Sequence, residues 1–217
     1  KVKPILSGIC GTDMGAILYK SSPALTPFSS FPSIPGHEVV GIVTEVGKEV
    51  TRVKVGDRIA IDPFISCAVR GVEEPCPACQ AGLHCLCRYS GTSVGLAPGM
   101  LMGFCRDLPG AWSELFVAHE SMVIPVPDQL SHQQAVLIEP LSVGLHAVLR
   151  RPPQKGERVL IIGGGMMAFS ALVALKLLNL GCEIVHYCRR RYQKELSLKL
   201  GAHRVVQNLE ELEEDFL

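Results

Sequence analysis

Two short segments near the amino terminus combine residue types that can hold a metal ion. Cys10 lies in Gly-Ile-Cys-Gly-Thr-Asp, and His37 and Glu38 lie in Pro-Gly-His-Glu. A thiolate, an imidazole and a carboxylate can form a catalytic zinc site that leaves one coordination position open. On spacing alone, Cys10 can equally be a buried apolar residue and His37 a turn residue. His37 and Glu38 are adjacent, so both can bind one ion only across a kink in the chain; otherwise one of them supports the ligands from outside.

A second group of potential ligands lies between residues 63 and 110, where most of the nine cysteines are found. Cys76 and Cys79 have the Cys-x2-Cys spacing of zinc sites, and Cys67, Cys85 and Cys87 are nearby. A lobe without metal that simply contains spare thiols is the alternative. A zinc knuckle that binds nucleic acid is disfavoured, because basic and aromatic residues do not alternate with these cysteines.

A glycine-rich turn follows the apolar run from Arg158 to Ile162. Its pattern is Gly163-x-Gly165-x-x-Ala168. The first glycine permits a tight turn, the second lets a pyrophosphate approach the backbone, and the small third residue lets helix and strand pack closely. The phosphates would lie at the N-terminus of the following helix. The pattern therefore predicts a dinucleotide-binding turn.

The elements that must position the metal ligands are mostly strands. Short β-branched runs over residues 39–62 and 111–126 predict a β-rich region. The glycine- and proline-rich stretch 63–110 predicts a long irregular insertion between them. From Ser131 the spacing of apolar residues predicts a helix to Leu149, with Ser131 and Gln134 as its capping box and a kink at Pro140.

The elements that must position the glycine-rich turn alternate between strand and helix. We expect strands over residues 158–162, 183–187 and 205–206, and helices over residues 166–180, closed by Gly181, and 192–200. Together they predict a β-α-β-α-β unit with a parallel sheet.

The composition excludes several classes of protein. The chain has 217 residues, of which 47% are hydrophobic, so a buried core is expected and disorder is not. Its 21 basic and 21 acidic residues balance, which gives no electrostatic reason for a nucleic-acid or membrane partner. The longest apolar stretch, over residues 166–175, is shorter than the ~20 residues of a bilayer span. Nine cysteines without a secretory signal favour a reducing compartment, and we expect the cytoplasm.

These motifs, together with the Val-Gly-Asp-Arg turn at residues 55–58, resemble in type and order the zinc-dependent medium-chain dehydrogenases, a superfamily of alcohol, polyol, sugar and threonine dehydrogenases. The resemblance spans nearly the whole chain. It implies an α/β protein with a β-rich GroES-like catalytic domain over residues 1–140 and the first half of a Rossmann doubly wound parallel sheet over residues 141–217. It also implies a fragment, with one strand expected before Lys1 and the rest of the sheet after Leu217.

The resemblance implies a role for each residue of the first ligand group. Cys10 and His37 would hold the catalytic zinc, and Glu38 would bind it directly or after a movement. Thr12 would be the hydroxyl that relays the alcohol proton. Many polyol and threonine members of the superfamily carry His three residues after this threonine, whereas this chain has Gly15. The relay beyond Thr12 is therefore expected to differ.

Two further carboxylates acquire expected roles from the resemblance. Glu139, followed by Pro140, matches the polyol, sugar and threonine branch and would bind the catalytic zinc or its water. A Glu in an otherwise apolar helix is costly to bury unless it is paired or near a metal; a solvent-facing Glu at the kink is the alternative. The family's structural-zinc pattern Cys-x2-Cys-x2-Cys-x7-Cys falls on Glu73, Cys76, Cys79 and Cys87, and Cys67 and Cys85 are rival ligands.

The cofactor follows from the end of the second predicted strand of the dinucleotide-binding unit. The family's acidic ribose-binding position falls on Cys188, and Arg189 and Arg190 come next. The missing carboxylate removes a repulsion against a 2′-phosphate, and guanidinium groups suit a phosphate dianion. NADP(H) is therefore expected, with NAD(H) as the alternative cofactor. A solvated basic turn that does not touch the adenosine is the other interpretation.

The implied function is hydride transfer between an alcohol, of the polyol, sugar or hydroxy amino acid type, and a nicotinamide cofactor. Zinc would lower the pKa of the substrate hydroxyl. Two other functions stay open: a non-catalytic, zinc-stabilised dinucleotide-binding or interaction module, and a reductase of the same superfamily without catalytic zinc. The full-length protein is expected to be a homo-oligomer whose substrate is a small molecule.

Overall fold

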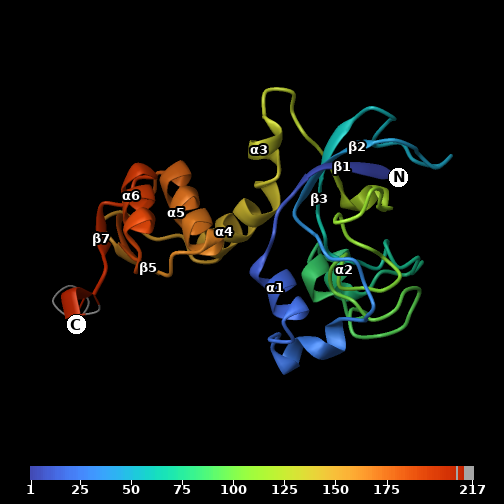
Figure 1. Cartoon of the computed structure of the whole chain (residues 1–217), viewed down its shortest axis with the longest axis horizontal. Helices are drawn as coiled ribbons and strands as arrows, with labels where there is room; N and C mark the ends of the chain where they lie inside the picture. The colour runs from blue at the N-terminus through green and yellow to red at the C-terminus, as the bar shows by residue number, and fades with distance from the viewer. Residues whose placement is uncertain (209, 213–217) are drawn as a thin grey trace. The chain divides into compact units, whose positions relative to one another are not determined.

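The computed structural model describes residues 1–208 and 210–212. The chain forms two compact units, Lys1–Glu139 and Pro140–Leu217, which are described separately below (Figure 1). Residues 209 and 213–217 of the expected second domain lie outside the described residues. Within the described part, no helix is both long enough and apolar enough to cross a membrane.

An antiparallel sheet organises the first unit. Its strands pair in chain order and comprise β1 (Val2–Ser7), β2 (Val39–Val43), β3 (Arg58–Ile61) and β4 (Val123–Pro125). Valine and isoleucine dominate β2 and β3, as expected for strands that are buried. The core of this unit contains large side chains with almost no exposed surface, among them Phe116, Ile59, Ile61, Met102 and Met122.

Short helical turns join these strands. They are α1 (Gly11–Ile17), η1 (Pro23–Phe28), α2 (Pro77–Gln80), η2 (His84–Leu86) and η3 (Glu120–Met122). The irregular insertion predicted over residues 63–110 is confirmed, since its regular structure consists of α2, η2 and isolated bridges. The prediction of strands over residues 111–126 is correct only for β4 and for a single bridge between Phe116 and Val2. The N–H groups of Ala111 and Trp112 donate instead to the carbonyls of Gly36 and Pro35, outside any regular ladder.

The helix predicted over residues 131–149 is in fact two helices, α3 (His132–Ala135) and α4 (Ile138–Arg150). The predicted capping box is confirmed: Ser131 Oγ accepts a hydrogen bond from Gln134 N–H at 3.2 Å, and Gln134 Oε1 accepts one from Ser131 N–H at 2.9 Å. The predicted kink at Pro140 is wrong. Pro140 lies in the first turn of α4, where its missing N–H has no helical partner to lose.

Strand and helix alternate in the second unit, as predicted (Figure 1). The strands β5, β6 and β7 form a parallel sheet in that order. Asn179, in the left-handed conformation at φ 47°, ends α5 before the predicted stop at Gly181. The elements are β5 (Arg158–Ile162), α5 (Met166–Leu178), β6 (Glu183–Tyr187), α6 (Arg191–Lys199) and β7 (Arg204–Val206).

Candidate functional site

The chain brings the first ligand group together between β1 and β2. Cys10 is the residue that caps the start of α1, and His37 and Glu38 come directly before β2. Gly36 has φ +102°, a conformation that favours glycine and turns the chain before His37. Because His37 and Glu38 lie outside the regular strand, they need not point to opposite faces. The kink that the sequence analysis required is at Gly36.

The ligand atoms of this group form a compact cluster. The Cys10 sulfur, one imidazole nitrogen of His37 and one carboxylate oxygen of Glu38 all lie within 4.8 Å of one another. His37 and Glu38 are buried, and Cys10 is partly exposed. A set of one sulfur, one nitrogen and one oxygen donor fits a zinc ion that keeps a further position open.

Asp13 is a buried carboxylate that the sequence analysis did not assign. Its Oδ2 accepts a hydrogen bond from Cys10 N–H at 2.9 Å, and its Oδ1 lies 3.3 Å from His37 Nδ1. Neither Oδ1 nor Nδ1 has another hydrogen-bond partner among the described residues. Since Nδ1 faces Asp13, Nε2 is the nitrogen available to a metal. The Cys-x2-Asp spacing is a signal for the local bond to Cys10 N–H, but not for the contact with His37.

The surroundings of the cluster favour an ionised sulfur. The hydrogen bond with His37 lowers the pKa of the Cys10 thiol, and burial opposes it. Burial disfavours the imidazolium form of His37, but hydrogen bonds with Asp13 and Cys10 outweigh burial and raise the pKa of His37 to about 10. The thiolate is the form of cysteine that binds a metal.

Gly8 and Trp112 form one wall of the cluster. A Cβ atom on Gly8 would overlap the Glu38 carboxylate, so glycine is required there for space. The Trp112 indole N–H donates a hydrogen bond to the Gly8 carbonyl at 3.2 Å, and the indole lies against Gly36. Trp112 is the single tryptophan of the chain, so its fluorescence can report on this site.

Thr12 lies between the cluster and a cavity of about 1000 Å³. Hydrogen bonds from its side chain and backbone contribute to the lowered pKa of Cys10, which places the Thr12 hydroxyl beside the sulfur. Phe104 also lines the cavity, and its ring meets the His37 ring edge-on at a centroid distance of 5.8 Å. The cavity therefore adjoins the cluster through both Thr12 and Phe104. Gly15, three residues after Thr12, is part of its lining.

Glu139, which the resemblance led us to expect at the catalytic zinc or its water, is not in the compact cluster. Among the described residues, the group within 4.8 Å contains Cys10, His37 and Glu38 alone. Burial raises the pKa of Glu139, the charge of His37 opposes this, and the carboxylates of Glu38, Asp62 and Asp13 add to it. Glu139 thus lies within electrostatic reach of the cluster. Repulsion from the carboxylates around it opposes its closer approach.

The cysteine-rich lobe brings together four sulfurs. The ligand atoms of Cys67, Cys76, Cys79 and Cys87 all lie within 4.8 Å of one another, and these thiols form no disulfide. The Cys67 and Cys87 sulfurs are 3.7 Å apart. Zinc–sulfur bonds of ~2.3 Å in a tetrahedron place the sulfurs about 3.8 Å apart, so this geometry fits one zinc ion with four thiolates. Backbone hydrogen bonds from Arg88 and Cys79 lower the pKa of Cys76 to about 6.

The structure corrects the expected fourth ligand of the lobe. Glu73, on which the family pattern falls, is exposed and lies outside the sulfur cluster, and Cys67 takes its place. The reason is local: the N–H of Cys76 donates to the Cys67 sulfur at 3.3 Å, and the Val72 N–H bonds to the Cys67 carbonyl, so the chain folds back on Cys67. Cys85, the other rival, is exposed and outside the cluster.

Arg70 supports the lobe from within. It is buried, with 3% of its surface exposed, and its guanidinium donates to the carbonyls of Val94, Leu96 and Gly99 at 2.7–3.1 Å. The thiols of Cys105, Cys87 and Cys67 are near enough to act on its charge. A buried cation beside a group of thiolates offsets part of their negative charge. Sequence analysis missed Arg70, because a single arginine in an irregular segment carries no pattern.

The glycine-rich turn has the predicted geometry. Gly163 adopts φ +127° after β5, and Gly165 caps the start of α5. The Ala168 Cβ lies 3.8 Å from the position of a Cβ on Gly163, so the small residue allows close packing. A Cβ on Gly165 would meet no atom within 4 Å, which leaves its backbone open to a ligand.

The residues expected at the cofactor ribose differ in orientation. Cys188 is buried, and its sulfur lies 3.9 Å from Ser197 Oγ, so the thiol points into the unit. Arg189 and Arg190 are exposed in the turn between β6 and α6. The structure therefore presents the two arginines to solvent, but not Cys188.

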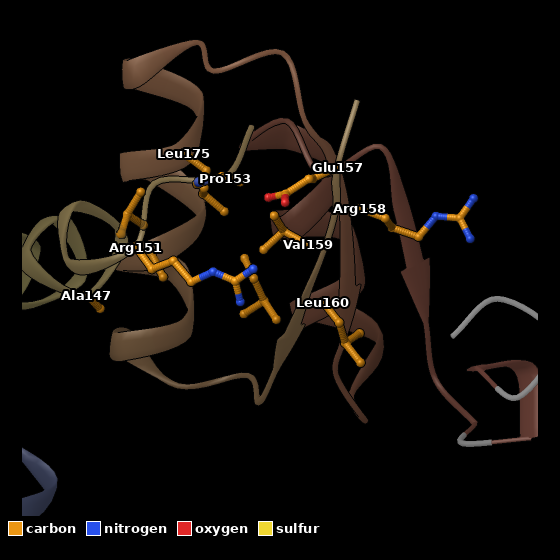
Figure 2. Close-up of a pocket in the computed structure, with 11 residues that line it drawn as sticks. Ala147, Arg151, Pro153, Glu157, Arg158, Val159, Leu160 and Leu175 are labelled. Carbon is orange, nitrogen blue, oxygen red and sulfur yellow. The ribbon is translucent and has the colours of Figure 1, made fainter. Parts of the chain in front are cut away.

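A second cavity, of about 570 Å³, lies against β5 in the second unit. Figure 2 shows Arg151 reaching toward Val159, whereas Arg158 points away. β5 pairs with β6 on one side and is an edge of the described sheet. None of the residues that line this cavity belongs to either ligand cluster or to the glycine-rich turn, so it is not part of the candidate site.

Comparison with known families identifies the first unit. The alcohol dehydrogenase GroES-like domain matches residues 1–128, more than half of the chain. The chain belongs to this family. The resemblance noted from the motifs is thereby confirmed, as is the α/β fold class that it implied.

Two curated relatives of this GroES-like chain are named as dehydrogenases. It is 33% identical over 211 residues to (R,R)-butanediol dehydrogenase of Saccharomyces cerevisiae, a match that covers 89% of the chain and 52% of the relative. It is 32% identical to sorbitol dehydrogenase of Bacillus subtilis, with 94% of the chain and 53% of the relative covered. The chain spans about half the length of the curated relatives it matches.

Solved structures similar to the GroES-like chain have the same fold. A putative zinc-binding dehydrogenase from Sinorhizobium meliloti bound to NADP has a TM-score of 0.76 at 30% identity, covering 94% of this chain and 53% of that one. Galactitol-1-phosphate dehydrogenase from Escherichia coli has a TM-score of 0.74 at 25% identity, covering 97% and 53%.

Proposed function

We propose that this chain carries the catalytic zinc site and the nicotinamide-cofactor turn of an alcohol dehydrogenase acting on polyol or sugar substrates. The observation that carries the proposal is the cluster of Cys10, His37 and Glu38 beside a large cavity that reaches Thr12. The related dehydrogenases, named for butanediol and sorbitol, support the same class of reaction.

Each residue of the cluster has a distinct part in this reaction. Cys10, His37 and Glu38 would hold the ion, and Asp13 would fix the orientation of His37 through Nδ1. Bound zinc supplies a Lewis acid that lowers the pKa of a substrate hydroxyl. The Thr12 hydroxyl, between the sulfur and the cavity, would accept the alcohol proton and pass it outward.

The cavity lining combines apolar side chains, such as Phe28 and Leu101, with polar groups that could bind the hydroxyls of a polyol or sugar. Its lining is rich in groups that can hydrogen-bond to several hydroxyls of one substrate, and it includes the cation of Lys20. These polar residues are Thr12, Lys20, Ser21, Ser22, Thr26, Ser29, Ser30 and Ser33. A hydroxy amino acid, the other class expected from the sequence, would also find hydrogen-bond partners here.

NADP(H) is the proposed cofactor, and NAD(H) the alternative. Gly163, Gly165 and Ala168 would hold the pyrophosphate, and the exposed Arg189 and Arg190 would contact the 2′-phosphate. The NADP-bound relative from Sinorhizobium meliloti supports this choice. Changing both arginines to alanine should weaken NADP(H) far more than NAD(H) in a calorimetric titration. Equal losses would mean that the turn does not recognise the 2′-phosphate.

Metal analysis combined with activity tests the proposal as a whole. In the full-length protein we expect two zinc ions per chain, and changing Cys10 or His37 should abolish polyol oxidation while the lobe keeps its zinc. One zinc ion with retained activity would favour the reductase without catalytic zinc. If the full-length protein binds the dinucleotide but shows no turnover, the non-catalytic module is favoured. Homo-oligomerisation and a cytoplasmic location stay predictions for the full-length protein.

A further inference from the structure

His186 is a fully buried histidine in the middle strand of the parallel sheet, and nothing so far accounts for it. Its neighbours Ile184 and Val185 are apolar residues of the kind such a strand requires. Burial lowers the pKa of His186, and the hydrogen bond with Gly163 opposes this shift. A buried polar side chain in this position needs hydrogen-bond partners, and it has two.

One partner of His186 is the glycine-rich turn. Nε2 lies 2.5 Å from the Gly163 carbonyl, and because a carbonyl only accepts, Nε2 carries the proton. The other partner is the Ser197 hydroxyl on α6, 2.9 Å from Nδ1. The ring also meets Phe169 of α5 edge-on, with centroids 5.5 Å apart. His186 therefore ties the turn to β6, α5 and α6.

Gln193 holds the next peptide of the same turn. Its Nε2 donates to the Gly164 carbonyl at 2.8 Å, and its Oε1 accepts from Arg190 N–H at 3.0 Å. The Gln193 carbonyl in turn lies 2.6 Å from Ser197 Oγ. A Cβ on Gly164 would overlap the Gln193 amide, so this contact requires glycine. The two carbonyls of the turn are thus anchored by one connected network.

The orientation of these carbonyls determines where the following N–H groups point. In a trans peptide the C=O and the next N–H are antiparallel. Since the Gly163 and Gly164 carbonyls face inward, the N–H groups of Gly164 and Gly165 face away from the network. Backbone N–H groups at the start of a helix are the donors that bind phosphate oxygens.

We propose that His186 and Gln193 are positioning residues for the cofactor pyrophosphate, which hold two peptides of the glycine-rich turn with their N–H groups directed outward. The inference rests on the proposed cofactor function. It adds two side chains, from a strand and a helix outside the glycine motif, that preorganise the turn before the dinucleotide binds.

The test compares His186→Leu with a control in the same sheet. His203 is also a histidine with a backbone partner, since its Nδ1 accepts from Ile184 N–H at 2.8 Å, but it lies at the opposite end of β6 from the turn. We expect His186→Leu to weaken NADPH binding about tenfold in a calorimetric titration, the scale of one hydrogen bond. Hydrogen exchange of the Gly164 and Gly165 amides should rise in the cofactor-free chain. His203→Leu should change neither quantity.

Two further variants keep the test decisive if His186→Leu fails to fold. Gln193→Met removes the donor to Gly164 on a partly exposed helix and should give the same pair of effects. His186→Gln, which can still donate to Gly163, should recover part of the affinity. A lower melting temperature with unchanged NADPH affinity and unchanged hydrogen exchange would overturn this inference but not the proposed cofactor function. If the unmodified chain binds no NADP(H), the proposed cofactor function fails and the inference fails with it.

Discussion

The two ligand clusters of the GroES-like unit are equally compact but differently built. In the lobe, four identical sulfurs come from an irregular segment of the chain. In the other cluster, a sulfur, an imidazole and a carboxylate come from the ends of a helix and a strand. Four thiolates complete a tetrahedron and leave no position for a substrate, whereas three mixed donors leave one.

The charged side chains beside the two clusters also differ. The buried cation of Arg70 lies beside the lobe thiols, and carbonyls hold it in place. The buried carboxylate of Asp13 lies beside the mixed cluster and faces His37. One environment offsets the charge of a closed site, and the other orients a ligand of an open site that reaches a cavity. We therefore predict a stabilising role for the lobe and a chemical role for the mixed cluster.

Removing the fourth sulfur of the lobe should have the largest effect. We expect Cys67→Ser to lower the zinc affinity of the lobe by more than about 100-fold. Loss of a group that only supports a ligand costs about 10–100-fold, and loss of a ligand should cost more. Because a metal that binds only the folded state stabilises it, the melting temperature should fall as well. Zinc content by mass spectrometry and competition with a chromogenic chelator measure the effect.

Glu73→Gln is the matched control for Cys67→Ser. The two positions are the rival fourth ligands, and Glu73 is exposed outside the sulfur cluster. Its replacement should change the zinc affinity by less than about twofold. The melting temperature should stay within about one degree of that of the unmodified chain. A large zinc loss in Glu73→Gln, with little in Cys67→Ser, would restore the family pattern and contradict the structure.

His37→Ala should separate the two clusters. It removes one ligand of the mixed cluster, so the second zinc ion should be lost while the lobe keeps its own. The melting temperature should change less than in Cys67→Ser, because the mixed cluster joins elements already held by the sheet. Trp112, next to Gly8 and Gly36, provides the readout: zinc added to the chelated chain should change its emission, and His37→Ala should abolish that response. Loss of both ions would show that the clusters are not independent.

Regular patterns in the sequence predicted the elements and most of the residues that the two clusters bring together. Alternating strand and helix signals located β5, α5, β6 and α6 within a residue or two. The pairing of Cys10 with His37 and Glu38 followed from motifs, and its one geometric requirement, the kink, is met at Gly36.

The sequence could not identify contacts made across irregular segments. Cys67 replaces Glu73 because the loop folds back on it, and loop paths leave no periodic signal. Asp13 and Trp112 reach the cluster through tertiary packing, so their roles depended on knowing where Gly8 and His37 lie. The kink predicted at Pro140 was wrong for a similar reason. A proline can kink a helix or lie in its first turn, and the sequence did not show that the helix begins at Ile138.

Asp13→Asn should have an intermediate effect on the mixed cluster. The change removes the charge that faces His37 Nδ1 while preserving the shape of the side chain, so zinc affinity should fall about 10–100-fold. Lobe zinc should be unaffected. Asp57→Asn is the control: this partly exposed carboxylate pairs with Lys54 in a turn, and its change should leave both sites unchanged. Zinc titration followed by Trp112 emission compares the two variants, and equal affinities would mean that Asp13 does not support His37.

The smallest effect should come from Glu139, and its comparison with Glu38 shows whether the open site has three protein ligands or four. Both are carboxylates near His37, but only Glu38 is in the compact cluster. Glu38→Gln should therefore lower zinc affinity by well over tenfold, and Glu139→Gln by less than about tenfold, the lower end of outer-shell effects. Trp112 emission during zinc titration measures both. Equal losses would make Glu139 a direct ligand, and the mixed cluster would then be closed by protein groups like the lobe.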